Sequence, residues 1–180
     1  KNIAEGYDPV TNTWETLNSM SVARKGVACA VLNGKFYAIG GVGLSSVEIY
    51  DPSTESWSTG ASLPSVVKSG AAITIGGKIY LIGGINGAEQ TISQVKCFDP
   101  STTQWQTKES MPKAKHSAKL IWFKNRIWVI GGKDQNGDPS NNVESYDPSE
   151  NTWQTEASLN SARFWPISWV GNGGIFVGIG

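Results

Sequence analysis

The sequence predicts an all-β fold built from a repeated four-stranded unit, and three features of its 180 residues predict it. An aromatic residue followed by Asp-Pro occurs four times, a tryptophan follows each copy at a fixed distance, and a glycine pair follows the first three tryptophans at a second fixed distance. The composition agrees, because 21 glycines, 8 tryptophans and only 17% charged residues suit a β protein with frequent turns. A fixed period of this kind governs the fold of the whole chain.

The spacing of these elements is nearly constant. The aromatic residues are Tyr7, Tyr50, Phe98 and Tyr146, the tryptophans are Trp14, Trp57, Trp105 and Trp153, and the glycine pairs are Gly40-Gly41, Gly83-Gly84 and Gly131-Gly132. Every tryptophan lies 7 residues after its aromatic residue, and each glycine pair begins 26 residues after a tryptophan. The first repeat is shorter only between the glycine pair and the next aromatic residue, which predicts a variable loop on a fixed scaffold.

Each repeat is predicted to contain four strands. Two β-rich runs precede the glycine pair, and turns such as Asn33-Gly34 and Gly76-Gly77 join them into a hairpin. The first runs span residues 27–32, 71–75 and 118–123, and the second span 35–39, 78–82 and 126–130. A third strand ends at each aromatic residue (47–50, 95–98 and 143–146), and the fourth surrounds each tryptophan. Short strands in evenly spaced groups of four match the blades of a propeller.

The glycine doublet, Tyr-Asp-Pro and Trp at these offsets resemble the kelch motif over essentially the whole chain. The resemblance implies one kelch-type β-propeller domain, residues 1–180. It would comprise the third and fourth strands of one blade (1–19), three repeats (20–62, 63–110 and 111–158) and the first two strands of a last blade (159–180). The two end pieces either form one composite blade that closes a ring of four, or belong to an arc of a larger ring. In the fourth repeat Ile179 and Gly180 replace the glycine pair, and Pro166 predicts a distorted blade.

The repeated motif residues are predicted to be scaffold. The glycines let backbones approach where a side chain does not fit. The aromatic residues and tryptophans are expected to bury their rings between blades. The aspartates of Asp-Pro recur once per blade around a ring, so turn capping explains them better than metal binding or acid–base catalysis.

The sequence predicts no catalytic residue, metal site or cofactor. His116 is the only histidine, which excludes the copper site of galactose oxidase-like propellers and disfavours a Ser-His-Asp hydrolase. A formal net charge of zero disfavours nucleic acid and anionic membrane as partners. Cys29 and Cys97 are too few for a disulfide framework, and no signal peptide or apolar run of membrane-spanning length is present. A cytoplasmic protein is therefore expected.

Function is predicted to lie on one face, where the first strand of each repeat enters and the variable loop leaves. A basic residue stands at the entry position of three repeats, Arg24, Lys115 and Arg163, whereas Val67 occupies it in the remaining repeat. The next position adds Lys25, Lys68 and His116, and together these residues predict a basic crown around the mouth of the propeller. The resemblance to kelch substrate receptors implies contact with acidic or phosphorylated peptides through Arg24 and Arg163, and less directly through Lys115. Solvated rim charges or strand-entry anchors are the alternative interpretation. The predicted partner-binding residues are Arg24, Lys25, Lys68, Ile85, Lys115, His116, Lys133, Asp134 and Arg163.

The resemblance implies a protein-interaction domain without catalytic activity, of the kind that recognises substrates in BTB-kelch adaptors of cullin ubiquitin ligases. Two other classes remain open. Some kelch proteins bind actin through the sides of their blades, and a sugar-active propeller similar to the bacterial sialic-acid mutarotases would be an enzyme. That enzyme would show converging Arg and Glu groups.

Overall fold

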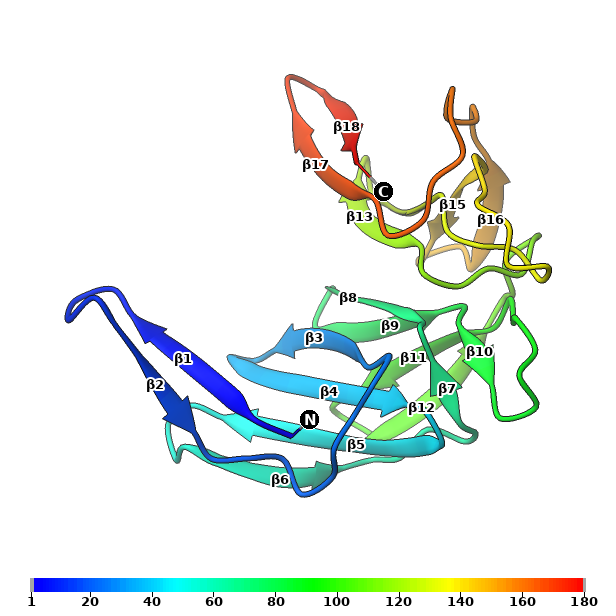
Figure 1. Cartoon of the computed structure of the whole chain (residues 1–180). Helices are drawn as coiled ribbons and strands as arrows, with labels where there is room; N and C mark the ends of the chain where they lie inside the picture. The colour runs from blue at the N-terminus through cyan, green and yellow to red at the C-terminus, as the bar shows by residue number, and fades with distance from the viewer. Residues whose placement is uncertain (1, 180) are drawn as a thin grey trace.

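The computed structural model describes residues 2–179, and every regular element in this part of the chain is a β-strand (Figure 1). Three antiparallel sheets have four strands each, in the order β3-β4-β5-β6, β8-β9-β11-β12 and β13-β14-β15-β16, and we call them blades 1, 2 and 3. Their strands are β3 (Ala28–Leu32), β4 (Lys35–Gly41), β5 (Leu44–Asp51), β6 (Ser56–Gly60), β8 (Ala71–Ile75), β9 (Lys78–Ile82), β11 (Val95–Asp99), β12 (Gln104–Lys108), β13 (Lys119–Phe123), β14 (Arg126–Ile130), β15 (Val143–Asp147) and β16 (Thr152–Thr155). The predicted all-β class and four-stranded blades are confirmed.

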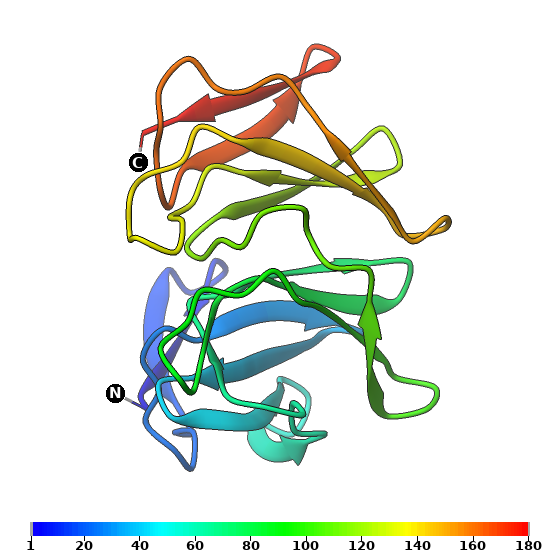
Figure 2. The same ribbon diagram turned by 90° about the vertical axis from the view of Figure 1, so that its right-hand side faces the viewer.

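Two further sheets are half-blades at the ends of the arc. β1 (Ala4–Asp8) pairs with β2 (Thr13–Leu17), and β17 (Ile167–Gly171) pairs with β18 (Gly174–Gly178). Figures 1 and 2 show these hairpins at opposite ends of an open arc of blades. The first hairpin corresponds to the outer two strands of a blade and the last to the inner two. The chain therefore forms part of a propeller ring, and the alternative of a composite blade closing this ring is not realised.

The inner strands β3, β8, β13 and β17 lie side by side around the axis of the arc. A row of backbone hydrogen bonds joins the residues just before them: Ser69 N to Gly26 O (2.8 Å), Ser117 N to Ser69 O (2.9 Å) and Trp165 N to Ser117 O (2.8 Å). These four residues occupy equivalent positions in successive repeats, and all have φ between +47° and +65°. The row fixes the spacing of neighbouring strand entries, and hence the mouth of the propeller.

The hairpin turns between inner strands have the backbone that the sequence predicts. Asn33 and Gly34 have φ of +51° and +73°, and Gly76 and Gly77 have +58° and +71°. Positive φ at both central residues defines the primed turn that matches the twist of paired strands. The hairpin β17–β18 has the same turn at Asn172-Gly173, and Pro166 lies just before β17. The predicted distortion of this hairpin is therefore wrong, because Pro166 removes no hydrogen-bond donor from the ladder.

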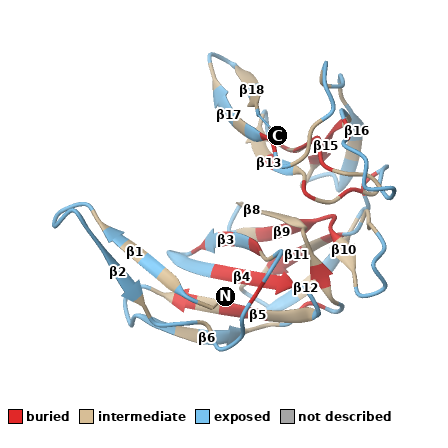
Figure 3. Cartoon of the chain, viewed as in Figure 1, coloured by how far each residue is buried: buried red, intermediate tan, exposed pale blue. Residues whose placement is uncertain are grey.

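The core fills the space between adjacent blades (Figure 3). Tyr50, Phe98 and Tyr146 are buried, and each packs on the tryptophan opposite it in its own sheet with ring centroids 5.0–5.3 Å apart. Rings also meet across blades, as in the pairs Tyr37–Phe98 (5.9 Å) and Tyr80–Tyr146 (6.1 Å). Aromatic pairs of this geometry add to the stabilisation from area burial.

The prediction that all motif rings are buried is wrong for the first copy, and in the other copies Trp57, Trp105 and Trp153 are half-buried. Tyr7 is 48% exposed and Trp14 is 70% exposed. Both lie on the half-blade β1–β2, which lacks inner strands and a preceding blade in the described structure, so nothing covers one side of these rings.

The Asp-Pro turns are capped by their aspartates. In three repeats the carboxylate accepts a hydrogen bond of 2.9 Å from the backbone N–H two residues later. Lys35 and Lys78 also reach Asp51 and Asp99 across the sheet, with Nζ–Oδ2 distances of 2.7 Å. The lysine bonds, followed by those from Ser53 and Ser101, lower the pKa values of Asp51 and Asp99 to about 2.

These two carboxylates make the fold sensitive to acid. Their folded pKa values lie below the value of about 3.9 in unfolded chains, so their stabilisation is complete above that pH and is lost as the pH falls towards 2. We expect the urea midpoint to fall most steeply between about pH 4 and pH 2. Circular dichroism during urea titrations measures it, and Asp99→Asn should make the decline shallower. An equally steep decline in Asp99→Asn would exclude this carboxylate as a cause.

No helix that could span a membrane occurs among the described residues.

Candidate partner-binding face

The entry segments and the variable loops meet on one face, as short backbone pairings. In blade 2 the ribbon β7 (Val67–Lys68) pairs with β10 (Ile85–Asn86), which places Lys68 opposite Ile85. In the next repeat His116 and Lys133 exchange backbone hydrogen bonds of 3.0 and 2.8 Å. The structure thus brings together four residues that the sequence predicts for binding, as the pairs Lys68–Ile85 and His116–Lys133. Both pairs lie beside the row of backbone hydrogen bonds at the mouth.

Charged groups on this face differ in their solvent exposure and in the contacts that they already make. Lys25 is exposed, whereas Lys68 is half-buried and forms an ion pair with Glu89 on the loop after blade 2's glycine pair. The Nζ of Lys133 lies 4.2 Å from the ring centroid of Phe164, which occupies the position equivalent to Lys25. A cation over an aromatic face is attracted by the ring. Lys133 is therefore held across the boundary between blade 3 and the half-blade β17–β18.

Asp134 shapes its own loop. Its carboxylate accepts backbone hydrogen bonds from Asn136 (2.8 Å) and Asp138 (3.1 Å). Its backbone carbonyl accepts a long hydrogen bond of 3.4 Å from the hydroxyl of Thr91 on the neighbouring loop. Between these loops lies a polar hollow of about 510 Å³, lined by Glu89, Gln90, Thr91, Ile92, Gln135 and Asn136. The sequence did not single out these lining residues, although the unequal loop lengths indicated where they would lie.

His116 offers little to a hydrolytic reaction. Its Nδ1 lies 2.9 Å from the hydroxyl of Ser117, and Ser117 is buried. Burial, and then the charge of Lys133, lower the pKa of His116. No group of three His, Cys, Asp or Glu side chains able to hold a metal occurs between residues 2 and 179.

Arg24 is buried within blade 1 and does not face a partner. Its guanidinium donates to Glu48 Oε2 (3.2 Å from Nε and 2.9 Å from Nη2), to the backbone carbonyls of Gly40 and Ser46 (2.8 Å each) and to the Ser46 hydroxyl (3.0 Å). Glu48 also accepts from Ser21. Burial acts to raise the pKa of Glu48, but the bonds from Ser21 and Arg24 outweigh it and lower that pKa.

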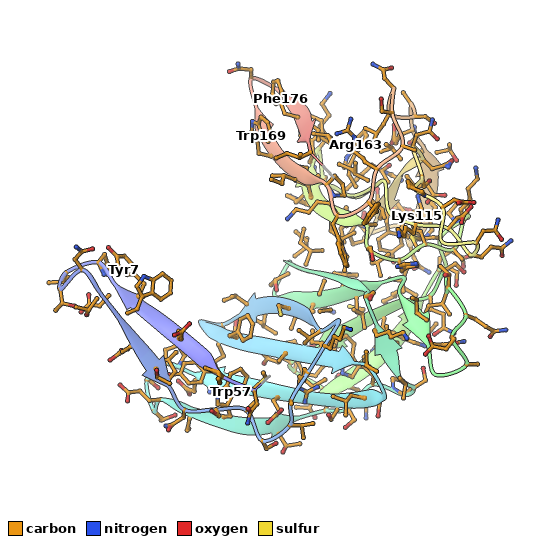
Figure 4. All side chains as sticks on the ribbon, viewed as in Figure 1. Tyr7, Trp57, Lys115, Arg163, Trp169 and Phe176 are labelled. Atoms are coloured by element: carbon orange, nitrogen blue, oxygen red, sulfur yellow. The ribbon has the colours of Figure 1, made fainter. Side chains whose placement is uncertain are left out.

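Lys115 occupies the same position in blade 3 and is also buried (Figure 4). Its Nζ lies 2.9 Å from Glu144 Oε2, but neither atom makes a well-aligned hydrogen bond with any described residue. Burial lowers the pKa of Lys115, and the charge of Glu144 opposes this shift. The pair is thus a close ionic contact without the hydrogen-bond network that surrounds Arg24.

The predicted basic crown is therefore wrong at Arg24 and Lys115, which point into the blades. A signal for this existed in the sequence. Glu48 and Glu144 stand two residues before the motif tyrosines, whereas Lys96 stands there in the repeat whose entry residue is Val67. Base and acid are thus present together or replaced together, as expected of side chains that touch. Arg163, the last entry residue, is half-buried, and its Nε is buried without a partner in the described structure.

The mouth opens into a channel along the inner strands. A cavity of about 450 Å³ there is lined mainly by small residues from three blades, among them Cys29, Ala72 and Ala118, with Trp165 at one side. Trp165 is 67% exposed. The channel therefore offers mainly backbone and small side chains, and Lys119 on β13 is the one charged residue among the described residues that line it.

The fold and this face define the chain as an arc of a β-propeller whose blades carry variable loops on one side. The Kelch motif matches residues 23–64, 68–112 and 123–160, more than half of the chain, and the chain belongs to the kelch family. Among solved structures, that of YjhT matches with a TM-score of 0.82 at 20% sequence identity, covering 91% of this chain. The match spans 61% of the YjhT chain, and at this identity it shows the fold alone.

Proposed function

We propose that this kelch arc is a protein-interaction domain that binds a protein or peptide segment on its entry face, without catalysing a reaction. The observation that carries the proposal is the contrast between a constant scaffold and a variable face. Backbone hydrogen bonds link four equivalent residues at the mouth in the same way from one repeat to the next. The side chains just before these residues, Lys25, Lys68, His116 and Phe164, differ from repeat to repeat. Loops on one rim of a rigid scaffold are the usual carriers of recognition.

The charge of this face favours an acidic segment. Lys25 is exposed and its ammonium group can reach a ligand, whereas half-buried Lys68 and Lys133 already contact Glu89 and the Phe164 ring, so an acidic ligand would compete with or add to those contacts. Ile85 and Asp134 border the same surface, and Arg163 closes it on the side of β17–β18. Arg24 and Lys115 support the face from beneath by fixing the strand entries to their blades.

The finer proposal is that the face selects substrates for a cullin ubiquitin ligase in the cytoplasm, as in BTB-kelch adaptors. The support for it is the kelch repeat and the basic residues Lys25, Lys68 and Lys133 on the entry face. Isolation of the full-length protein from cells together with a cullin would support it, and isolation with actin filaments alone would contradict it.

Charge reversal tests the binding face. We expect Lys25→Glu/Lys133→Glu to weaken binding of fluorescent Asp- and Glu-rich peptides about tenfold in polarisation assays at low salt, because each surface pair contributes up to about 1 kcal/mol. Lys124→Glu is the matched control, because Lys124 lies in the β13–β14 turn at the opposite rim. Equal binding and equal capture of cellular proteins by the double variant and the control would refute the proposed face.

A further inference from the structure

A crevice of about 480 Å³ lies between blades 2 and 3, on the rim opposite the entry face. Turn residues of both blades line its edge, namely Gly76 of the β8–β9 turn, Asn125 of the β13–β14 turn and Ser149 of the β15–β16 turn. Both blades have all four strands, so the crevice lies at an internal interface of the arc. Its volume is within the range of sites that hold small organic molecules.

Blade 2 departs from blade 3 in the polar side chains that face this crevice. In blade 3 the Nε of Arg126 donates to the hydroxyl of Ser145 (2.7 Å), and that hydroxyl donates to Glu156 Oε1 (2.6 Å). The equivalent residues of blade 2 all line the crevice and are Lys78, Cys97 and Lys108. A second ammonium group in blade 2 therefore stands where blade 3 has a carboxylate.

The ammonium group of Lys108 has no acidic partner. Lys78 binds Asp99, with an Nζ–Oδ2 distance of 2.7 Å. Asp147, the acidic residue in the crevice lining, lies 3.4 Å from Arg126 Nη1. Lys108 is half-buried and forms no ion pair with any residue from 2 to 179. The crevice thus contains one positive charge that the described side chains do not neutralise.

Both ammonium groups act on the same spot, the Cys97 thiol. Cys97 is 2% exposed and lines the crevice beside the buried Tyr80. Burial raises the pKa of the thiol, and the hydroxyl of Tyr80 opposes this rise. The charges of Lys108 and Lys78 oppose it as well. An anionic group placed over the thiol would therefore be attracted by both lysines.

One wall of the crevice is an aromatic ring that the equivalent positions of blades 1 and 2 lack. Trp122 lies on β13, where β3 has Val31 and β8 has Thr74. Its ring is half-buried, and its Nε1 donates to no residue in the described part of the chain, whereas the Nε1 of each motif tryptophan in blades 1 to 3 donates to a backbone carbonyl. A partly open indole offers its face to another planar ring.

We propose that this crevice binds a small aromatic carboxylate, with its carboxylate between Lys108 and Lys78 and its ring against Trp122. The carboxylate takes the place that Glu156 has in blade 3, which favours this group over other anions. The ring supplies the apolar contact that most small-molecule sites need beside a few polar groups. The site is on the rim opposite the entry face, so it does not depend on what that face binds.

Titration with naphthoate tests the proposal, with the indole N–H resonance of Trp122 followed in proton–nitrogen NMR spectra. The variant Trp122→Phe identifies that resonance. We expect it to shift saturably with a dissociation constant of about 1 mM, the affinity that a ligand of this size reaches at modest efficiency. The neutral amide naphthamide should bind about fivefold more weakly at low salt, because it is not attracted by the two ammonium groups.

Variants at position 108 separate the charge from the ring. Lys108→Gln should weaken naphthoate binding about fivefold and leave naphthamide binding unchanged, since it removes only the charge. Lys108→Glu should abolish saturable naphthoate binding, because it places a carboxylate in the crevice as in blade 3. Lys96→Gln is the matched control, since Lys96 adjoins Cys97 on β11 but points to the other face of blade 2, where it donates to Thr107.

The control should bind naphthoate like the wild type, and far-ultraviolet circular dichroism verifies that each variant is folded. Three results would each overturn the proposal. Naphthoate could leave the Trp122 resonance unmoved, naphthamide could bind as tightly as naphthoate, or Lys108→Gln could bind naphthoate as tightly as Lys96→Gln does.

Discussion

Gly40→Ala is expected to destabilise the protein by about 3 kcal/mol, whereas Gly34→Ala costs about 1 kcal/mol. Both glycines have left-handed backbone, with φ of +65° and +73°, so both substitutions carry the conformational cost of about 1–2 kcal/mol for a residue with a Cβ. Only Gly40 adds a clash, because its Cβ would lie 2.3 Å from the backbone oxygen of Val67 in blade 2, while nothing lies within 4 Å at Gly34. Overpacking of this kind adds about 1–3 kcal/mol.

Urea denaturation followed by tryptophan fluorescence measures both free energies of unfolding. Gly83→Ala provides an independent copy of the experiment, since its Cβ would lie 2.3 Å from the backbone oxygen of Lys115. Equal losses in Gly34→Ala and Gly40→Ala would mean that backbone conformation alone requires glycine, and that the close approach between blades does not.

The repeat makes the blades predictable from the amino-acid sequence. Strand spans, hairpin turns and the close approach at the glycine pairs all follow from short-range patterns that recur with one period. The exposure of Tyr7 and Trp14 does not follow, because burial of those rings depends on the neighbours that each copy has. A motif residue has the same local structure in every copy, but its exposure is set by the position of its blade in the arc.

The candidate face was predictable in position but not in chemistry. The chain reversal at the glycine pair places strand entries and loops together, which is a matter of topology. Whether a basic entry residue points towards solvent or into its blade depends on a single side chain on another strand. This partner is Glu48 for Arg24, 24 residues later, and Glu144 for Lys115, 29 residues later. Only comparison of repeats, in which Val67 coincides with Lys96, reveals that dependence.

Lys115→Val is expected to destabilise the protein by about 3–5 kcal/mol, the largest single effect that the structure predicts. The substitution leaves Glu144 buried without a partner charge, and an uncompensated buried charge carries a penalty of this size. The second substitution Glu144→Lys should recover most of the loss. It transplants the arrangement of blade 2, where Val67 stands at the entry and Lys96 donates to Thr107 Oγ1 at 2.8 Å.

The acceptor for the transplanted lysine is already in place. Thr155 lies opposite Glu144 in blade 3, as Thr107 lies opposite Lys96 in blade 2. A double-mutant cycle from urea titrations gives the coupling between positions 115 and 144, which we expect to exceed about 2 kcal/mol. Additive losses in the double variant would mean that the ion pair is not what holds Lys115 in the blade, and that the exchange in blade 2 has another cause.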